Sequence, residues 1–391
     1  MLGGLSLTLS AGLVGASLGV ASGAVRSSAP SNVSTSSFNN SFSIMSEFKG
    51  LASSGHGKVA ALLPDTVSST RYVEFDQPDI TKALTKAGLS SSQFVVQNAL
   101  GSDATQLTDA QTDISNGATV LLVDPLDSGV GAQIESYAKQ RGVRVIDYDR
   151  LTLGGSRAYY VSFNNVTVGR VMGQGLVSCV ADWHVSKPEV VVMHGAVTDN
   201  NATLFAQGYD SVINPYFSKH GWTAVAHTAG TWDPPTAETE FQAVYTAHHN
   251  VNSALIPNDE TGAPIITYLQ SLHVKPKSFP TTGQDATLTG LQNVLAGYQC
   301  GTVYKPIYLE AQAAVALALY LRAGKTPPAS LVNGSTQDTT AGVKVPSVLM
   351  VPKWVTTKNM NSTVIKDNFV PASQLCAGQY AADCTAAGIH P

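Results

Sequence analysis

Charged residues are scarce in this chain, and Lys and Arg form no cluster along it. Of its 391 residues only 13% are charged, and the formal net charge is −4 at pH 7. A surface that binds a phosphate backbone needs clustered positive charge, so the composition argues against a nucleic-acid partner. Hydrophobic residues make up 43% of the chain. That share can bury large cores, and it excludes a chain that is disordered overall.

Two motifs are also missing. Residues 64–69, which follow the first expected strand, contain no glycine. They therefore lack the Gly-x-Gly-x-x-Gly loop of a dinucleotide-binding oxidoreductase. No two cysteines have the CxxC spacing of a thiolate metal site. We therefore expect neither a metal nor a cofactor.

The N-terminal segment, residues 1–25, is apolar and carries no charge before Arg26. It is typical of a secretory signal peptide, with Ser22-Gly23-Ala24 as an acceptable cleavage site. A membrane anchor is the alternative, because the apolar run approaches the roughly 20 residues that a span requires. Frequent Gly and Ser favour the cleaved signal. Residues 26–56 begin Ser/Asn-rich and are expected to form a flexible leader. We expect an exported protein, periplasmic or held at the cell surface.

The cysteine count fits two disulfides in an exported protein, with three possible pairings. The four cysteines are Cys179, Cys300, Cys376 and Cys384. The short separation of Cys376 and Cys384 favours a bond that clips the C-terminal tail. That bond would leave Cys179 with Cys300.

From Lys58 onward, short apolar segments alternate with helical ones. The expected strands are 59–63, 94–97, 119–123, 143–147 and 159–163 in the first half, and 190–193, 223–227, 253–257, 279–282 and 302–303 in the second. Such alternation predicts an α/β fold in which helices cover both faces of a parallel sheet. The cycle restarts at a helix over 166–183, so we expect two lobes of similar topology.

Polar side chains follow most of these strands, where ligands bind in open α/β sheets. The polar segments are 69–72, 149–150, 198–201, 230–233, 258–260, 284–285 and 304–305. Asp and Asn can bond adjacent hydroxyls, Arg and Lys donate to oxygens, and an aromatic face covers the C–H face of a sugar. The residues that could instead cap helices are Asn200, Asn201 and Asp285. The residues expected to face solvent are Asp124, Asp127 and Glu260.

Six stretches, in their order and spacing, resemble the sugar-binding proteins of ABC importers, most closely the D-xylose-binding type. They are residues 148–150, 160–166, 198–202, 257–259, 283–286 and 303–306. The resemblance covers about residues 57–350 and implies the type I periplasmic binding protein fold, with two Rossmann-like lobes joined by three crossings. It implies that the ligand cleft is lined by Arg71, Tyr72, Asp149, Arg150, Asp199, Asn201, Trp232, Asn258, Asp285 and Lys305. Residues 69–72 depart from the xylose pattern, which leaves the sugar open.

The expected domains follow from this resemblance. The N-terminal lobe is expected at 57–163 plus 306–340, the C-terminal lobe at 164–305 plus 341–352, and an irregular tail at 353–391. The expected function is capture of a monosaccharide, D-xylose or a related pentose or hexose, for an ABC permease, by a monomer that is not an enzyme. The alternatives are a sugar-sensing receptor component and a sugar hydrolase that uses Asp149 and Asp285. A sugar-responsive regulator would need a helix-turn-helix at the N-terminus, where the apolar segment stands instead.

Overall fold

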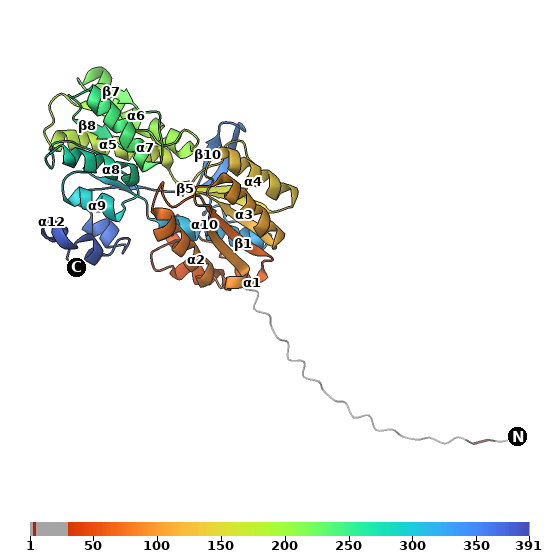
Figure 1. Cartoon of the computed structure of the whole chain (residues 1–391). Coiled ribbons are helices and arrows are strands. Elements are labelled where there is room, and N and C mark those ends of the chain that lie inside the picture. Colours follow the sequence, from red (N-terminus) through yellow and green to blue (C-terminus); the bar gives the residue numbers. More distant parts are fainter. Residues whose placement is uncertain (1–2, 5–29, 391) are drawn as a thin grey trace.

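The computed structural model describes residues 3–4 and 30–390, and a seven-stranded sheet forms the centre of its first lobe (Figure 1). The strand order is β10-β11-β5-β4-β3-β1-β2, and every pair is parallel except β10 with β11. The strands are β1 (Lys58–Leu63), β2 (Phe94–Asn98), β3 (Ala118–Val123), β4 (Arg144–Tyr148), β5 (Tyr159–Phe163), β10 (Gly334–Asp338) and β11 (Val343–Met350). The central strands β1 and β3 are nearly all apolar because helices cover both faces of the sheet.

The helices of this N-terminal lobe are α2 (Gln77–Lys86), α3 (Asp103–Ser115), α4 (Ser128–Gln140) and α10 (Ile307–Arg322). A five-residue helical turn, η3 (Tyr72–Asp76), precedes α2 and carries Tyr72 into the interior. Thirteen residues of α10 are buried. Ten of them are apolar and lie all round the helix, which therefore has no face that suits water.

The C-terminal lobe repeats the pattern around a three-stranded parallel sheet of order β7-β6-β8. Its elements are α5 (Asn165–Asp182), β6 (Glu189–Val192), α6 (Asn200–Lys219), β7 (Thr223–His227), α7 (Pro234–Ala247), β8 (Ser253–Leu255), α8 (Asp259–Ser271) and α9 (Leu288–Leu295). The predicted strand at 279–282 is reduced to one bridge, between Ala254 and Thr281. Pro280 lies inside that segment, has no N–H to donate and interrupts the ladder.

Helices α5 and α6 cross at unusually close range because glycines stand at the contact. A Cβ on Gly169 of α5 would lie 2.0 Å from the carbonyl oxygen of Phe205 on α6. A Cβ on Gly208 of α6 would lie 2.2 Å from the carbonyl oxygen of Val166. The close crossing brings the N-termini of both helices to the edge of the lobe that faces the first sheet.

Three crossings join the lobes, at the junctions β5–α5, β9–α10 and β11–β12, where β9 is Thr302–Tyr304 and β12 is Lys353–Val355. Strands β9 and β12 pair with each other in the C-terminal lobe. The expectation that residues 341–352 belong to that lobe is wrong for β11. This strand forms a hairpin with β10 and pairs in parallel with β5, so it completes the sheet of the N-terminal lobe.

The leader is also packed rather than flexible from residue 30 onward. It forms two short 3₁₀ turns, η1 (Thr35–Ser37) and η2 (Ser43–Phe48), and the helix α1 (Lys49–Ser54). Its buried apolar side chains are Val33, Phe38, Phe42, Met45, Phe48 and Leu51. These side chains join the core of the N-terminal lobe. The free energy gained by burying them is enough to order the leader despite the polar Ser and Asn residues around them. The predicted signal peptide or anchor at 1–25 lies outside the described residues, apart from residues 3–4.

The tail packs on the C-terminal lobe and is not irregular. After β12 it contains the turn η5 (Asn361–Ile365) and the short helices α11 (Ala372–Leu375) and α12 (Ala381–Ala386), which lie beside α9 (Figure 1). The structure pairs Cys179 with Cys300 and Cys376 with Cys384. Among the described residues, no helix combines the length and the apolar character that crossing a membrane requires.

Candidate functional site

A small polar cavity lies between the lobes, at the carboxyl ends of the strands of both sheets. Its lining residues are Ser68, Ser69, Arg71, Tyr72, Asp149, Arg150, Asp199, Asn201, Phe205, Trp232, Asn258, Gln284, Asp285 and Lys305. All ten residues expected to line the cleft are therefore brought together here. Ser68, Ser69, Phe205 and Gln284 are additional lining residues.

Asp149 stands at the centre of the site, directly after β4, in the left-handed backbone region with φ of 56°. Its carbonyl oxygen accepts bonds from Tyr160 Oη (2.7 Å) and Ser162 Oγ (2.8 Å) of β5. It also accepts one from Asn201 Nδ2 (2.9 Å) of the other lobe. Donors from both lobes thus hold the backbone of Asp149, and its carboxylate points into the cavity.

Arg71 binds the carboxylate of Asp149. The guanidinium is buried, and it donates to Asp149 Oδ1 at 2.7 Å, to both oxygens of Asp76 at 2.8 Å and to Glu310 Oε2 at 2.8 Å. Burial alone would raise the pKa of Asp149, but Arg71, Lys305 and Arg150 outweigh it and lower that pKa. Burial raises the pKa of Glu310 to about 8. Because three carboxylates already occupy most of its donors, Arg71 chiefly orients Asp149.

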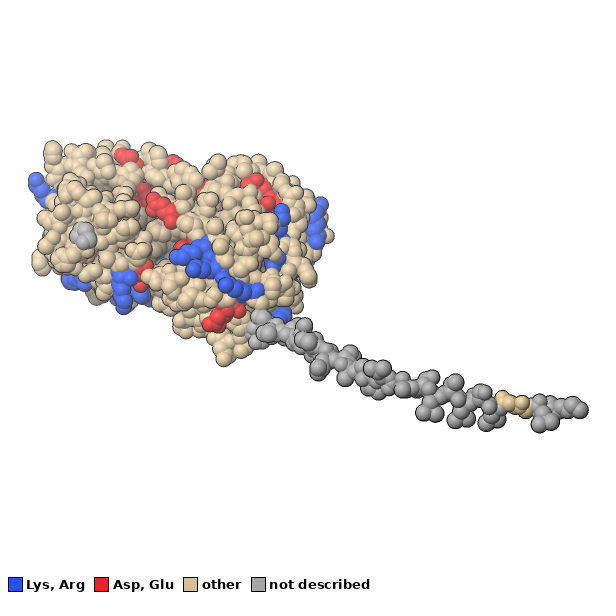
Figure 2. All heavy atoms as spheres, turned by 90° about the horizontal axis from the view of Figure 1, so that it is seen from below, with Lys and Arg blue, Asp and Glu red and all other residues tan. Residues whose placement is uncertain are grey.

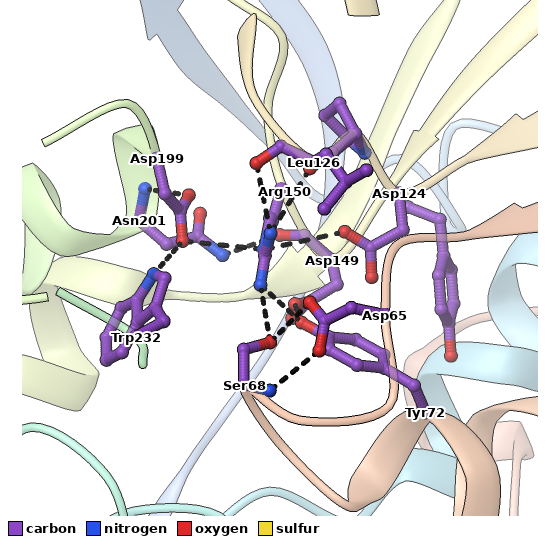
Figure 3. Close-up of polar contacts among 12 residues, drawn as sticks. Asp65, Ser68, Tyr72, Asp124, Leu126, Asp149, Arg150, Asp199, Asn201 and Trp232 are labelled. Atoms are coloured by element: carbon purple, nitrogen blue, oxygen red, sulfur yellow. Dashed lines mark hydrogen bonds and ion pairs between the residues drawn. The ribbon is translucent and has the colours of Figure 1, made fainter. Parts of the chain in front are cut away.

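Arg150 reaches across the cavity toward both lobes (Figure 3). Its Nη2 donates to Tyr72 Oη at 3.1 Å and to Ser68 Oγ at 3.3 Å, and its Nε lies 3.5 Å from Asp199 Oδ2. Nη1 donates to the carbonyl oxygens of Pro125 and Leu126 at 3.3 Å. A fork of N–H donors is therefore held at one wall of the site.

The opposite wall comes from the N-terminus of α6 and the loop after β7. Asp199 caps α6 by accepting from Asn201 N at 2.9 Å, and its second oxygen accepts from Trp232 Nε1 at 3.0 Å. The indole packs tightly on Gly195, where a Cβ would lie 2.2 Å from the ring, and meets Phe205 edge-on. These contacts orient the large apolar ring of Trp232 at the cavity. Asp199 rather than Asn200 or Asn201 is the helix cap.

The remaining corner holds Asn258, Asp285 and Lys305. Lys305 Nζ lies 3.0 Å from Asp285 Oδ1 and 3.9 Å from Asp149 Oδ1, so this cation sits between two carboxylates. Asn258 both caps α8, through Thr261 N, and belongs to the cavity lining. Asp285 has a φ of 91° and does not cap α9, because Thr287 does.

Direct hydrogen bonds cross from one lobe to the other at the cavity mouth. Ser69 Oγ donates to Asp285 Oδ2 at 2.9 Å, and Asn258 Nδ2 donates to the carbonyl oxygen of Ser68 at 2.8 Å. Thr70 N donates to Glu260 Oε1 at 2.8 Å. The structure therefore has the two lobes in contact around the cavity.

One of the three residues expected to face solvent is fully buried instead, and a second is partly covered by the other lobe. Asp124 is 0% exposed and lies behind Arg150, and Glu260 bridges to the other lobe. Asp127 is partly exposed and caps α4 by accepting from Val130 N. The position of Asp124 at the end of β3, directly after a buried run, was the one available signal for its burial.

Comparison with known proteins gives a consistent family assignment. The family model described as periplasmic binding protein domain matches residues 60–326. The D-xylose-binding periplasmic protein of Escherichia coli is 33% identical over 293 residues, which cover 74% of this chain and 85% of the relative. The multiple sugar-binding periplasmic receptor ChvE of Rhizobium radiobacter is 28% identical over 335 residues, 82% of this chain and 92% of the relative.

A solved structure supports the assignment of the fold. The carbohydrate transporter solute binding protein from Chloroflexus aurantiacus, in complex with D-glucose, superposes with a TM-score of 0.72 at 26% identity. The match covers 81% of this chain and 97% of that chain. The two-lobed α/β architecture and the crossings between the lobes agree with that likeness. The chain belongs to the periplasmic binding protein family and has its type I fold.

Proposed function

We propose that this protein captures one monosaccharide in the cavity between its lobes, outside the cytoplasmic membrane, and delivers it to an ABC permease. The observation that carries the proposal is the convergence of polar side chains from both lobes, with one indole, in a single cavity. D-xylose is the first candidate because a relative of 33% identity is named for binding it. The D-glucose complex of the Chloroflexus protein extends the candidates to related pentoses and hexoses.

The chemistry of the lining suits hydroxyl groups. Asp149 and Asp285 can accept from pairs of adjacent hydroxyls, and Arg150 and Lys305 can donate to hydroxyl and ring oxygens. Trp232 offers an apolar face to the C–H side of the ring. Because donors come from both lobes, a sugar would stabilise the closed arrangement more than the open one, as a hinged capture mechanism requires.

The same contacts argue against a sugar hydrolase. A glycosidase needs a carboxylic acid that can give a proton to the leaving oxygen. The pKa of Asp149 is lowered by its cationic neighbours, and Asp285 lies against Lys305. Asp149 is thus held ready to accept hydrogen bonds rather than to donate a proton, and Asp285 is paired with a cation. A sensory role, which the word receptor in the name of the Rhizobium relative suggests, would use the same closed form.

The test is a thermal-shift screen of the purified protein against D-xylose, other pentoses and hexoses, followed by calorimetry. A ligand at 100 times its dissociation constant adds about 2.7 kcal/mol of stability, which raises the melting temperature measurably. We expect at least one pentose or hexose to do so with a stoichiometry of one. The proposal fails if no monosaccharide changes the melting temperature and calorimetry detects no heat of binding.

A further inference from the structure

Asp124 is a buried carboxylate for which the described residues provide no hydrogen-bond donor to either oxygen. It follows β3 and is 0% exposed. Its nearest cation is Arg150, whose Nε lies 3.7 Å from Asp124 Oδ1, which is longer than a hydrogen bond. Buried carboxylates are nearly always hydrogen-bonded, because a stranded charge is costly. A state of the molecule in which Asp124 ionises and pairs with a donor would remove this cost.

Arg150 Nε stands between two carboxylates that belong to different lobes (Figure 3). Asp199, in the C-terminal lobe, is 3.5 Å away and already accepts from Asn201 N and Trp232 Nε1. Asp124 and Arg150 follow β3 and β4, which are neighbours in one sheet. When the lobes separate, Asp199 must leave with α6, whereas Asp124 stays beside Arg150.

We propose that Asp124 is a positioning residue that pairs with Arg150 while the lobes are open and releases it toward Asp199 as they close. A shift of well under 1 Å would bring Nε within hydrogen-bond distance of Asp124. The open pair keeps the guanidinium aimed at the cavity, and the loss of that pair opposes closure until a sugar compensates for it. The inference rests on the proposed function for its ligand, but the pairing itself lies within one lobe.

The electrostatics of the closed form agree with this exchange. Burial raises the pKa of Asp124 well above its ordinary value, and the negative charges of Asp149 and Asp76 add to the effect. Arg150 and Arg71 oppose it, and the Tyr72 hydroxyl is a further titratable neighbour. Closure therefore favours protonated Asp124, so that sugar binding should strengthen as the pH falls.

The test measures the distance between the lobes in the full-length protein, with spin labels on Lys139→Cys of α4 and Lys219→Cys of α6, which are exposed positions. We expect Asp124→Asn to shift the ligand-free distance toward the distance seen with saturating D-xylose. We also expect it to lower the D-xylose dissociation constant by roughly threefold or more. The gain in affinity between about pH 8 and about pH 6 should shrink in this variant.

Asp127→Asn is the matched control, because it removes a charge from the same loop and Asn caps a helix as well as Asp does. Asp124→Leu, checked for folding by circular dichroism, should shift the lobes in the same direction as Asp124→Asn. An unchanged lobe distance in both Asp124 variants overturns the proposal, as does weaker sugar binding at unchanged distance. If D-xylose binds to none of these proteins, the proposed sugar is wrong, while the ligand-free distances still decide the role of Asp124.

Discussion

At the scale of single residues, the site consists of charges that neutralise one another beside the indole ring of Trp232. Trp232 is held by Gly195 beneath it and by its bond to Asp199, so its ring is ready before a ligand arrives. We expect Trp232→Ala to weaken sugar binding by about 1–3 kcal/mol, measured by calorimetry. Trp232→Phe keeps an aromatic ring but loses the hydrogen bond to Asp199. Its sugar affinity should therefore lie between those of the wild type and of Trp232→Ala. Equal affinity for all three proteins would exclude Trp232 from the binding surface.

Glu260 should make binding depend on pH. Burial, with smaller effects of Asp285 and Glu74, raises its pKa to about 7 although bonds from Thr70 oppose the rise. The segment of Thr70 and Glu74 belongs to the other lobe, so the burial that it provides and the negative charge of Glu74 raise this pKa in the closed form. A carboxyl with a raised pKa favours that form at low pH, and this contribution is lost as the pH rises through about 7.

We therefore expect tighter sugar binding at about pH 6 than at about pH 8, with a smaller difference in Glu260→Gln. Titration calorimetry at both values measures it. Asp124 acts in the same direction, so the double variant with Asp124→Asn should lose most of the dependence. A pH difference that survives undiminished in the double variant would show that other groups titrate on closure.

The polar segments of the site could be predicted because they follow buried strands, where open α/β sheets bind ligands, and the family resemblance indicated the ten individual residues. Asp124 and Glu260 obey the same rule but were expected to face solvent. Their burial depends on Arg150 and Thr70, which come from other segments, and a linear sequence does not show which segments will cover a side chain. Arg71 was expected in the cleft, but its three carboxylate partners could not be foreseen from residues 69–72.

At the scale of elements, the crossing of α5 and α6 decides where Asp199 and Asn201 lie. We expect Gly169→Val to destabilise the protein by about 1–3 kcal/mol or more, because the new side chain meets a backbone carbonyl that has no room to move. The shifted helix should also weaken sugar binding. Thermal denaturation and calorimetry measure the two effects.

Gly262→Ala is the matched control for this prediction. Gly262 is also a buried glycine within a helix of the C-terminal lobe, but the first atom that its Cβ would meet is Ile256 Cγ2 at 3.5 Å, an ordinary contact. Alanine there should leave stability unchanged or raise it slightly through its better helix propensity. If Gly169→Val has the melting temperature of the wild type, the close crossing of α5 and α6 is not needed for stability.

Alternation of strands and helices was enough to predict most elements, because buried strands and helices differ in length and in flanking glycines. The exceptions have identifiable causes. Pro280 broke an expected strand, and β11 joined the sheet of the other lobe through a hairpin that its own sequence pattern does not assign to either lobe.

At the scale of the whole molecule, the leader and the tail meet across the two lobes. Asn40 Nδ2, on the leader, donates to the carbonyl oxygen of Asp367 in the tail at 2.9 Å. Phe369 of the tail stacks on Phe75 of the N-terminal lobe with centroids 3.9 Å apart. On the face drawn in Figure 2, acidic and basic residues form separate small patches on a largely uncharged surface.

We expect Phe369→Ala to cost about 3–5 kcal/mol of stability if the stack is as tightly packed as a core contact. Phe369→Leu, which keeps most of the apolar volume, should cost less. Chemical denaturation of both variants measures the difference. A loss below about 1 kcal/mol for Phe369→Ala would mean that the tail contributes little to holding the lobes.

Two lobes were predictable at this scale from the repeated alternation and three crossings from the family resemblance, whereas the packing of the leader and the tail was not. The sequences of both segments appear polar or irregular because their apolar residues are widely spaced. Those apolar residues become buried only through contact with the folded lobes.

The two disulfides have a consequence for where the protein matures. One joins α5 to the segment that leads into β9, and the other closes a short loop in the tail. Such bonds persist where thiols are oxidised and are rare where glutathione keeps them reduced. A chain kept in a reducing compartment would therefore carry four thiols and lack both the link between α5 and β9 and the closed loop in the tail.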